Sequence, residues 1–148
     1  MYRLGILITG SRDFKDYDFV RSLFFPYSNL YKKEHVILYE GGQVSKEKAC
    51  FNPEYWGADY IAKTIAHELG WTIKSYYAKW KLHGKKAGII RNIEMIDAFY
   101  TSKEISEKVV IALPLEGSVG TIHAKNYAIS QKIKTLTYFY PDPTPQRC

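Results

Sequence analysis

The chain has 148 residues, which is the size of one domain and enough to bury a hydrophobic core. Hydrophobic residues make up 46% of it, and no segment approaches the length of a membrane span. The formal charge of +6 favours an anionic partner, but only weakly, since many proteins carry such a surplus. The two cysteines, Cys50 and Cys148, form neither a metal-ligand spacing nor a disulfide framework, which favours a reducing cytoplasm.

Apolar runs of strand length alternate with helical patterns along the chain. The first run, LGILIT, leads directly into Gly-Ser-Arg and indicates a strand rather than a signal peptide. The predicted strands are 4–9, 36–40, 71–77, 108–114 and 134–140. The predicted helices are 17–31, 57–70, 86–100 and 119–131. Gly70 is expected to end the second helix.

This alternation predicts an α/β fold with a single Rossmann-like domain over residues 1–140. We expect a five-stranded parallel sheet in the order 3-2-1-4-5, with helices on both faces. Residues 43–56 form an atypically long link between the second strand and the second helix, which is typical of a functional or mobile segment. Residues 141–148 are rich in proline and are expected to form an extended tail outside the core.

Unusual residues follow four of the predicted strands. These segments are TGSRDF at 9–14, the paired glycines that precede GAD at 57–59, the cationic stretch at 79–92, and PLEGSVGT at 114–121. In open α/β sheets, ligands bind outside the carboxyl ends of the strands, at the switch in strand order. All four segments are expected at that edge, so the sequence predicts a binding site there.

The first and last segments contain groups that bind phosphate. Gly10 permits a sharp turn near a ligand, Ser11 supplies a hydroxyl, and Arg12 offers a planar guanidinium. In GSVGT, peptide N–H groups at a helix N-terminus can hold an anion. The candidate residues of this loop are Gly117, Ser118, Gly120 and Thr121. GSVGT has neither the GxGxxG nor the Walker A pattern. Taken alone, TGSRDF is equally explained by a turn at Gly10 and an ion pair of Arg12 with Asp13 or Asp16, and GSVGT by a glycine-rich turn with Thr121 as a helix cap.

The two middle segments add a carboxylate and cations. Asp59, in the first turn of the second helix, either caps that helix or accepts hydrogen bonds from ligand hydroxyls. In GKKAGIIRN, Arg91 and Asn92 stand where the pattern becomes helical, and Arg91 shares a helix face with Met95. At least half of the nearby lysines are expected to form only a solvated face. Gly42 and Lys85 complete the candidate site, and Arg91→Ala is expected to lower affinity without unfolding the domain.

These residues resemble the YspA-related branch of the SLOG superfamily, from about Gly10 to Thr137. The resemblance rests on GSRDF, on GG followed by GAD, on HGKKAGIIRNIEM, and on the final GT. It implies a Rossmann-like fold, a nucleotide or nucleotide-derived ligand, and a homo-oligomer. The ligand contacts that it implies are Gly10, Ser11, Arg12, Asp59, Arg91, Asn92, Gly120 and Thr121. Relatives include the LOG-type phosphoribohydrolases, which cleave the base from a nucleoside monophosphate, and the DNA-processing protein DprA.

The chain departs from this family in two places. The phosphoribohydrolases carry Gly-Gly-x-Gly-Thr-x-x-Glu with a catalytic glutamate, whereas EGSVGTIHA puts Ala124 at that position. Relatives also run directly from the paired glycines to Gly-Ala-Asp, whereas residues 43–56 intervene here. We expect this insertion to form a lid or a contact with a partner subunit.

Three functions follow from these observations. The missing glutamate favours a sensor or sequestering protein for an ADP-ribose-like or cyclic signalling nucleotide, in the cytoplasm of a bacterial or phage-infected cell. The alternative is a nucleoside-monophosphate N-glycosidic hydrolase, for which the available groups are Asp59, Glu94, Glu116, His83 and His123. The third is single-stranded nucleic-acid binding, suggested by KWKLHGKK and the DprA kinship. No metal site is apparent, and no cofactor is expected beyond magnesium that accompanies phosphates.

Overall fold

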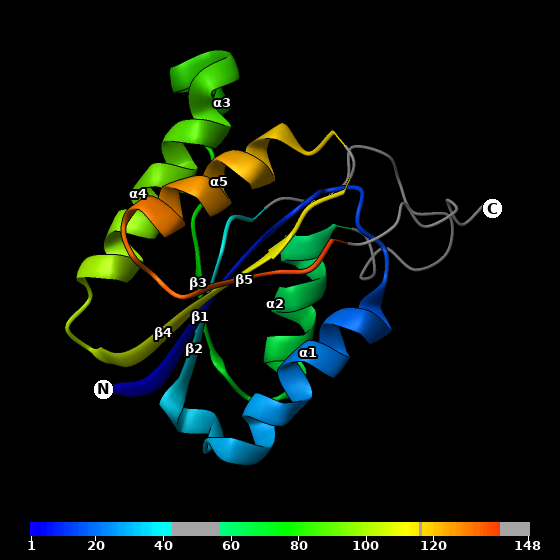
Figure 1. The fold of residues 1–148 in the computed structure, drawn as a ribbon, viewed down its shortest axis with the longest axis vertical. Coiled ribbons are helices and arrows are strands. Elements are labelled where there is room, and N and C mark those ends of the chain that lie inside the picture. Colours follow the sequence, from blue (N-terminus) through cyan, green and yellow to red (C-terminus); the bar gives the residue numbers. More distant parts are fainter. Residues whose placement is uncertain (43–56, 116, 140–148) are drawn as a thin grey trace.

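The computed structural model describes residues 1–42, 57–115 and 117–139. Five parallel strands form one sheet in the order β3-β2-β1-β4-β5 (Figure 1). The strands are β1 (Tyr2–Gly10), β2 (Val36–Glu40), β3 (Thr72–Ser75), β4 (Ile105–Leu113) and β5 (Thr135–Thr137). The predicted α/β fold and strand order are confirmed. The predicted link at 43–56 and tail at 141–148 lie outside the described residues.

Helices cover both faces of the sheet. The helices are α1 (Tyr17–Leu30), α2 (Ala58–Glu68), α3 (Trp80–His83), α4 (Ala87–Thr101) and α5 (Val119–Ser130). Figure 1 shows α1 and α2 on one face of the sheet and α4 and α5 on the other. Within the described ranges, no helix is long and apolar enough to cross a membrane. The four predicted helices are present, whereas α3 is a single turn that the sequence analysis did not predict.

Strand β1 lies at the centre of the sheet, and its two faces belong to two hydrophobic clusters. Ile6 and Ile8 pack in a cluster with residues of α1 and α2. Leu7 packs in the other cluster, together with Met95 and Phe99 of α4. Successive side chains of a strand point to opposite faces, and both faces of a parallel sheet are covered. This explains why LGILIT is a continuous apolar run instead of an alternating one.

Helix α2 ends as the sequence predicts. Gly70 has a φ of +75°, the left-handed conformation that favours glycine. Its N–H donates to the carbonyl of His67 at 3.1 Å, and the N–H of Trp71 donates to the carbonyl of Ala66 at 2.9 Å. This pair of bonds is the Schellman arrangement, which satisfies the last carbonyls of a helix.

The loop after β1 is anchored on the start of α2. The N–H of Ala58 donates to the carbonyl of Ser11 at 3.0 Å. Gly10 permits this approach, because a Cβ on it would lie 2.5 Å from the Cβ of Ala58. Close packing thus accounts for a glycine at position 10 even without a ligand. The same contact brings Asp59, the next residue of α2, to the loop that carries Ser11.

Gly10→Ala is therefore expected to lower the free energy of unfolding by about 1–3 kcal/mol, the usual cost of overpacking, because α2 must shift to admit the methyl group. Urea unfolding measures this change. Gly88→Ala is the control, since a Cβ there would meet Cη2 of Trp80 at 3.5 Å, an ordinary contact. Equal stability of the two variants would contradict the packing role of Gly10.

Candidate functional site

A cavity of about 380 Å³ opens at the carboxyl edge of the sheet. It is lined by residues that follow β1 and β4, the two strands that pair at the centre of the sheet. The chain continues from β1 towards β2 on one side and from β4 towards β5 on the other, so the cavity lies at the switch in strand order. Ligands bind at this place in open α/β sheets, and the volume is in the range of small-molecule sites.

The structure brings eleven of the twelve candidate residues to this cavity. They are Gly10, Ser11, Arg12, Asp59, Lys85, Arg91, Asn92, Gly117, Ser118, Gly120 and Thr121. Met95 lines it as well, on the helix face it was predicted to share with Arg91. All four unusual segments of the sequence therefore contribute to one cavity.

Gly42 is the candidate residue that does not line the cavity; its neighbour Gly41 does. Gly42 has a φ of +67°, and a Cβ there would lie 2.4 Å from the ring of Tyr77. Its N–H donates to Oε1 of Glu40 at 2.7 Å. A tight turn after β2 therefore accounts for this glycine.

The N-terminus of α5 forms one wall of the cavity. The first N–H groups of a helix have no partner within the helix, and they carry its partial positive charge. The N–H of Val119 donates to the carbonyl of Gly117 at 2.9 Å. In contrast, the N–H groups of Gly120 and Thr121 donate to no acceptor in the described part of the chain. The hydroxyl of Ser118 does not cap them, because it accepts from the N–H of Leu115 at 3.0 Å.

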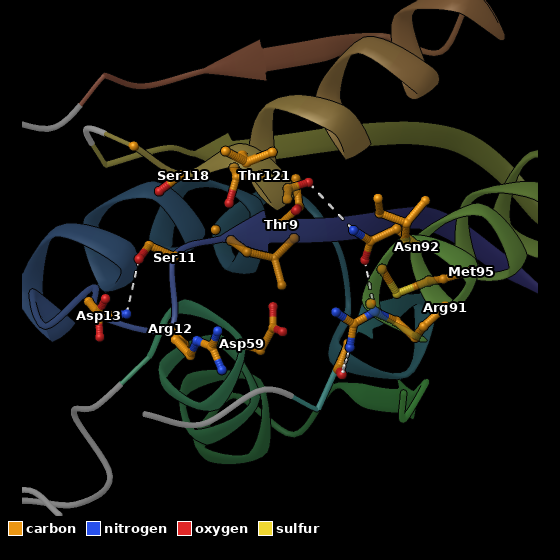
Figure 2. Close-up of a pocket in the computed structure, with 18 of the residues that line it drawn as sticks. Thr9, Ser11, Arg12, Asp13, Asp59, Arg91, Asn92, Met95, Ser118 and Thr121 are labelled. Atoms are coloured by element: carbon orange, nitrogen blue, oxygen red, sulfur yellow. Dashed lines mark hydrogen bonds between the residues drawn. The ribbon is translucent and has the colours of Figure 1, made fainter. Parts of the chain in front are cut away.

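The loop after β1 and the start of α2 form a second wall. Oγ of Ser11 accepts a hydrogen bond from the N–H of Asp13 at 3.0 Å, which holds the loop in a tight turn. Arg12 is half-buried at the next position. Figure 2 shows Asp59 between Arg12 and Arg91, with the three side chains pointing into the cavity. A carboxylate thus lies among cations on this side.

Arg91 is buried and makes three hydrogen bonds. Its Nη1 donates to the carbonyls of Gly41 and, at 3.5 Å, Tyr76, and its Nε donates to Oδ1 of Asn92 at 2.8 Å. Burial lowers the pKa of Arg91 from its ordinary value, while the charges of Asp59 and Glu40 act in the opposite direction. The guanidinium remains protonated, since arginine does not lose its charge in proteins. Arg91 therefore has a structural role as well as a place in the cavity.

Asn92 extends this network to α5. Its Nδ2 lies 3.5 Å from the carbonyl of Gly120, at the outer limit of a hydrogen bond. Figure 2 shows the dashed lines that connect Arg91, Asn92 and the α5 wall. The position of the helix N-terminus is thereby linked to the buried cation.

Sequence reasoning did not identify Glu40 as a component of the site. Glu40 is the last residue of β2 and is fully buried; its Oε2 has no hydrogen-bond partner in the described ranges. Burial raises the pKa of Glu40 above its ordinary value of 4.5. Only part of this rise is offset by nearby groups, which are the Ser75 hydroxyl, the Gly42 N–H and the charges of Lys63 and Arg91. The Ser75 hydroxyl lies near the carboxylate but forms no bond of normal geometry with Oε2. A carboxylate directly after a buried apolar run, in VILYE, is the signal that could have revealed it.

The groups considered for hydrolysis are mostly elsewhere. Asp59 lines the cavity, whereas Glu94 is exposed and, like His83 and His123, is not among the lining residues. Glu116 lies outside the described residues. Across the described ranges, no group of three His, Cys, Asp or Glu side chains is placed to hold a metal ion.

Trp80 and Ile89 are cavity residues that the predicted site omitted. Both belong to the cationic stretch at 79–92, in which KWKLHGKK, the segment that contains Trp80, indicated nucleic-acid binding and not a place in this cavity. An exposed aromatic residue among lysines is the signal that could have found Trp80.

The network around Arg91 changes the expectation for its removal. Arg91→Ala is expected to lower the free energy of unfolding by about 3 kcal/mol, because the buried groups that it compensates are left without a partner. Urea unfolding measures this change. Lys85→Ala is the control, because Lys85 is an exposed cation of the same cavity and its removal is expected to change the free energy of unfolding by less than about 0.5 kcal/mol. Full stability of Arg91→Ala would show that the arginine serves only a ligand.

Glu40 should make stability depend on pH. Because its pKa is raised in the folded protein, its contribution is fully present below pH 4.5 and is lost as the pH rises through the folded-state pKa. Glu40→Gln removes this titration. Between pH 4.5 and neutral pH, the free energy of unfolding of the variant should therefore fall less than that of the unaltered protein. Urea unfolding at several pH values gives both profiles. Parallel profiles would contradict the raised pKa.

A comparison with known proteins gives one relative that matches nearly the whole chain. No protein-family model matches this sequence, and no solved structure matches it significantly. The chain is 31% identical over 135 residues to the "Gene 61 protein" of Mycobacterium phage D29, and the match covers 90% of this chain and 94% of the phage protein. The protein described here belongs to the family of this phage Gene 61 protein.

Proposed function

We propose that this protein binds a nucleotide or a nucleotide-derived ligand in the cavity, with a phosphate group at the N-terminus of α5. The observation that carries the proposal is that Gly120 and Thr121 line the cavity and that their N–H groups have no acceptor within the described part of the chain. Peptide N–H groups at a helix N-terminus are a frequent binding site for phosphate.

The charges around the cavity support an anionic ligand. Arg12, Lys85 and Arg91 line it, against the carboxylates of Asp13 and Asp59. A guanidinium matches the geometry of phosphate oxygens, and a lysine adds a point charge. The carboxylate of Asp59 can accept hydrogen bonds from the hydroxyls of a sugar, as acidic residues do in dinucleotide sites. A ligand with both phosphate and sugar would use both kinds of group.

Binding without catalysis is the function that these groups favour. Hydrolysis of an N-glycosidic bond needs a group that stabilises the developing charge or activates water, and an acid for the leaving base. Asp13 and Asp59 are the carboxylates among the described lining residues, and no histidine accompanies them. Ala124, at the position of the glutamate of the phosphoribohydrolases, is fully buried in the core between α5 and the sheet. We infer a sensor or sequestering protein.

The setting of this function is part of the proposal. The relative at 31% identity comes from a bacteriophage. We propose that the protein acts in the cytoplasm of a bacterial or phage-infected cell, as a homo-oligomer of the SLOG type. ADP-ribose-like and cyclic signalling nucleotides are the ligand classes we favour, with or without magnesium on their phosphates.

A thermal-shift screen with AMP, NAD, ADP-ribose and cyclic AMP tests the proposal. A ligand at about 100 times its Kd stabilises the folded state by about 2.7 kcal/mol, which raises the melting temperature of a domain of this size by roughly 5–10 °C. Chromatography of each mixture shows whether the ligand is returned unchanged. Release of free base from AMP would establish a hydrolase instead. The protein would instead be a nucleic-acid-binding protein if it bound single-stranded oligonucleotides with an affinity that falls steeply with salt and did not respond to the four small ligands.

Gly120→Ala separates binding from stability. An added Cβ at Gly120 meets no atom within 4 Å, so the fold is expected to keep its stability or gain up to about 1 kcal/mol, because alanine is the better helix former. The methyl group would occupy space that a phosphate needs at the helix N-terminus, and we expect affinity to fall at least tenfold, or by about 1.4 kcal/mol. Isothermal titration calorimetry measures the affinity. Ile129→Ala, at the far end of the same helix, is the control that should leave binding unchanged. Unaltered affinity in Gly120→Ala would place the phosphate elsewhere.

A further inference from the structure

We infer that Trp80 is the stacking surface for the base of the bound nucleotide, an inference that rests on the proposed function. The ligand would then need an aromatic base in addition to its sugar and phosphate. Trp80 would make the cavity prefer sugar phosphates that carry a base over those that do not.

Trp80 lies at the cavity rather than in the core. It lines the cavity, and 50% of its surface is exposed. Trp71, in contrast, is buried and packs on Phe24, with ring centroids 5.3 Å apart. A large aromatic side chain gains most from burial, so an indole that is left half open beside a cavity has surface available for a ligand.

The backbone that carries Trp80 is a hydrogen-bonded turn. The N–H groups of Leu82 and His83 both donate to the carbonyl of Lys79, at 3.0 and 2.9 Å, and close the single turn of α3. Figure 1 shows α3 beyond the edge of the sheet, at the N-terminal end of α4. The ring of Trp80 lies beside Gly88 of α4, since a Cβ on that glycine would make an ordinary contact of 3.5 Å with Cη2 of Trp80. An aromatic surface that is ordered before binding loses little entropy when a base stacks on it.

The cavity lining contains both kinds of surface that a nucleotide needs. Its exposed apolar side chains include Trp80 of α3, Ile89 of α4 and Val119 of α5. Its cations are Arg12, Lys85 and Arg91. A nucleotide likewise has an apolar base face and a phosphate. Stacking on an aromatic side chain accepts any base, because every base has a flat π-face.

The test compares ligands with and without a base. AMP, ADP-ribose and ribose 5-phosphate are titrated by calorimetry into the unaltered protein, Trp80→Ala and Trp80→Phe. We expect Trp80→Ala to lower the affinity for AMP and ADP-ribose by about tenfold to a hundredfold, in the range measured for single stacked bases, and to leave ribose 5-phosphate unchanged. Trp80→Phe, which keeps an aromatic face, should retain most of the affinity. Leu82→Ala is the control, because Leu82 is 71% exposed on the same turn and does not line the cavity.

The outcomes separate this inference from the proposed function. Equal loss for all three ligands in Trp80→Ala would mean that Trp80 shapes the cavity without stacking a base. Unchanged affinities in Trp80→Ala would overturn the inference while the proposed function stands. If this variant also lost its oligomers on a sizing column, Trp80 would be assigned to an interface between copies of the chain. Failure of all three ligands to bind the unaltered protein, together with no response to NAD or cyclic AMP in the thermal-shift screen, would overturn both.

Discussion

The buried guanidinium of Arg91 is the interaction on which the site depends most. It ties the turn after β2 and the segment after β3 to α4, and through Asn92 it reaches the N-terminus of α5. A cation in a protein interior is costly unless acceptors and opposite charges surround it. The carbonyls of Gly41 and Tyr76 accept its hydrogen bonds, and the carboxylates of Glu40 and Asp59 supply the opposite charge. The turn after β2, the segment after β3, α4 and the start of α5 are therefore linked around one charge.

The glycines that the sequence analysis proposed for the site do not share one purpose. Gly10 allows a helix to pack on the central strand, and Gly42 adopts a left-handed turn. Gly120 has neither reason, since a side chain there would meet open space. Its backbone is therefore left open at an uncapped helix N-terminus, as the proposed phosphate would require. The phosphate proposal therefore rests on Gly120 more than on the other two.

The fold could be predicted because the apolar runs have the length of strands and most of the connections contain a segment with the period of a helix. The cavity could be predicted because parallel strands put their carboxyl ends at one edge, so segments far apart in sequence must meet there. Other features depend on the neighbours of a residue. The single turn Trp80–His83 is too short to produce a periodic pattern. The burial of Glu40 and the bonds of Arg91 are set by tertiary packing, which a pattern of charges does not contain.

The contact between Gly10 and Ala58 constrains how this family can diverge. A larger residue at either position would push α2 away from β1. Asp59 is the next residue of the helix, so such a change would displace its carboxylate in the cavity. It would also displace the loop after β1, which is hydrogen-bonded to Ala58. A substitution at position 10 alone is therefore expected to change the shape of the cavity. A smaller residue at position 58 would relieve the contact with Ala58, whereas Leu113 would still lie close to a side chain at position 10.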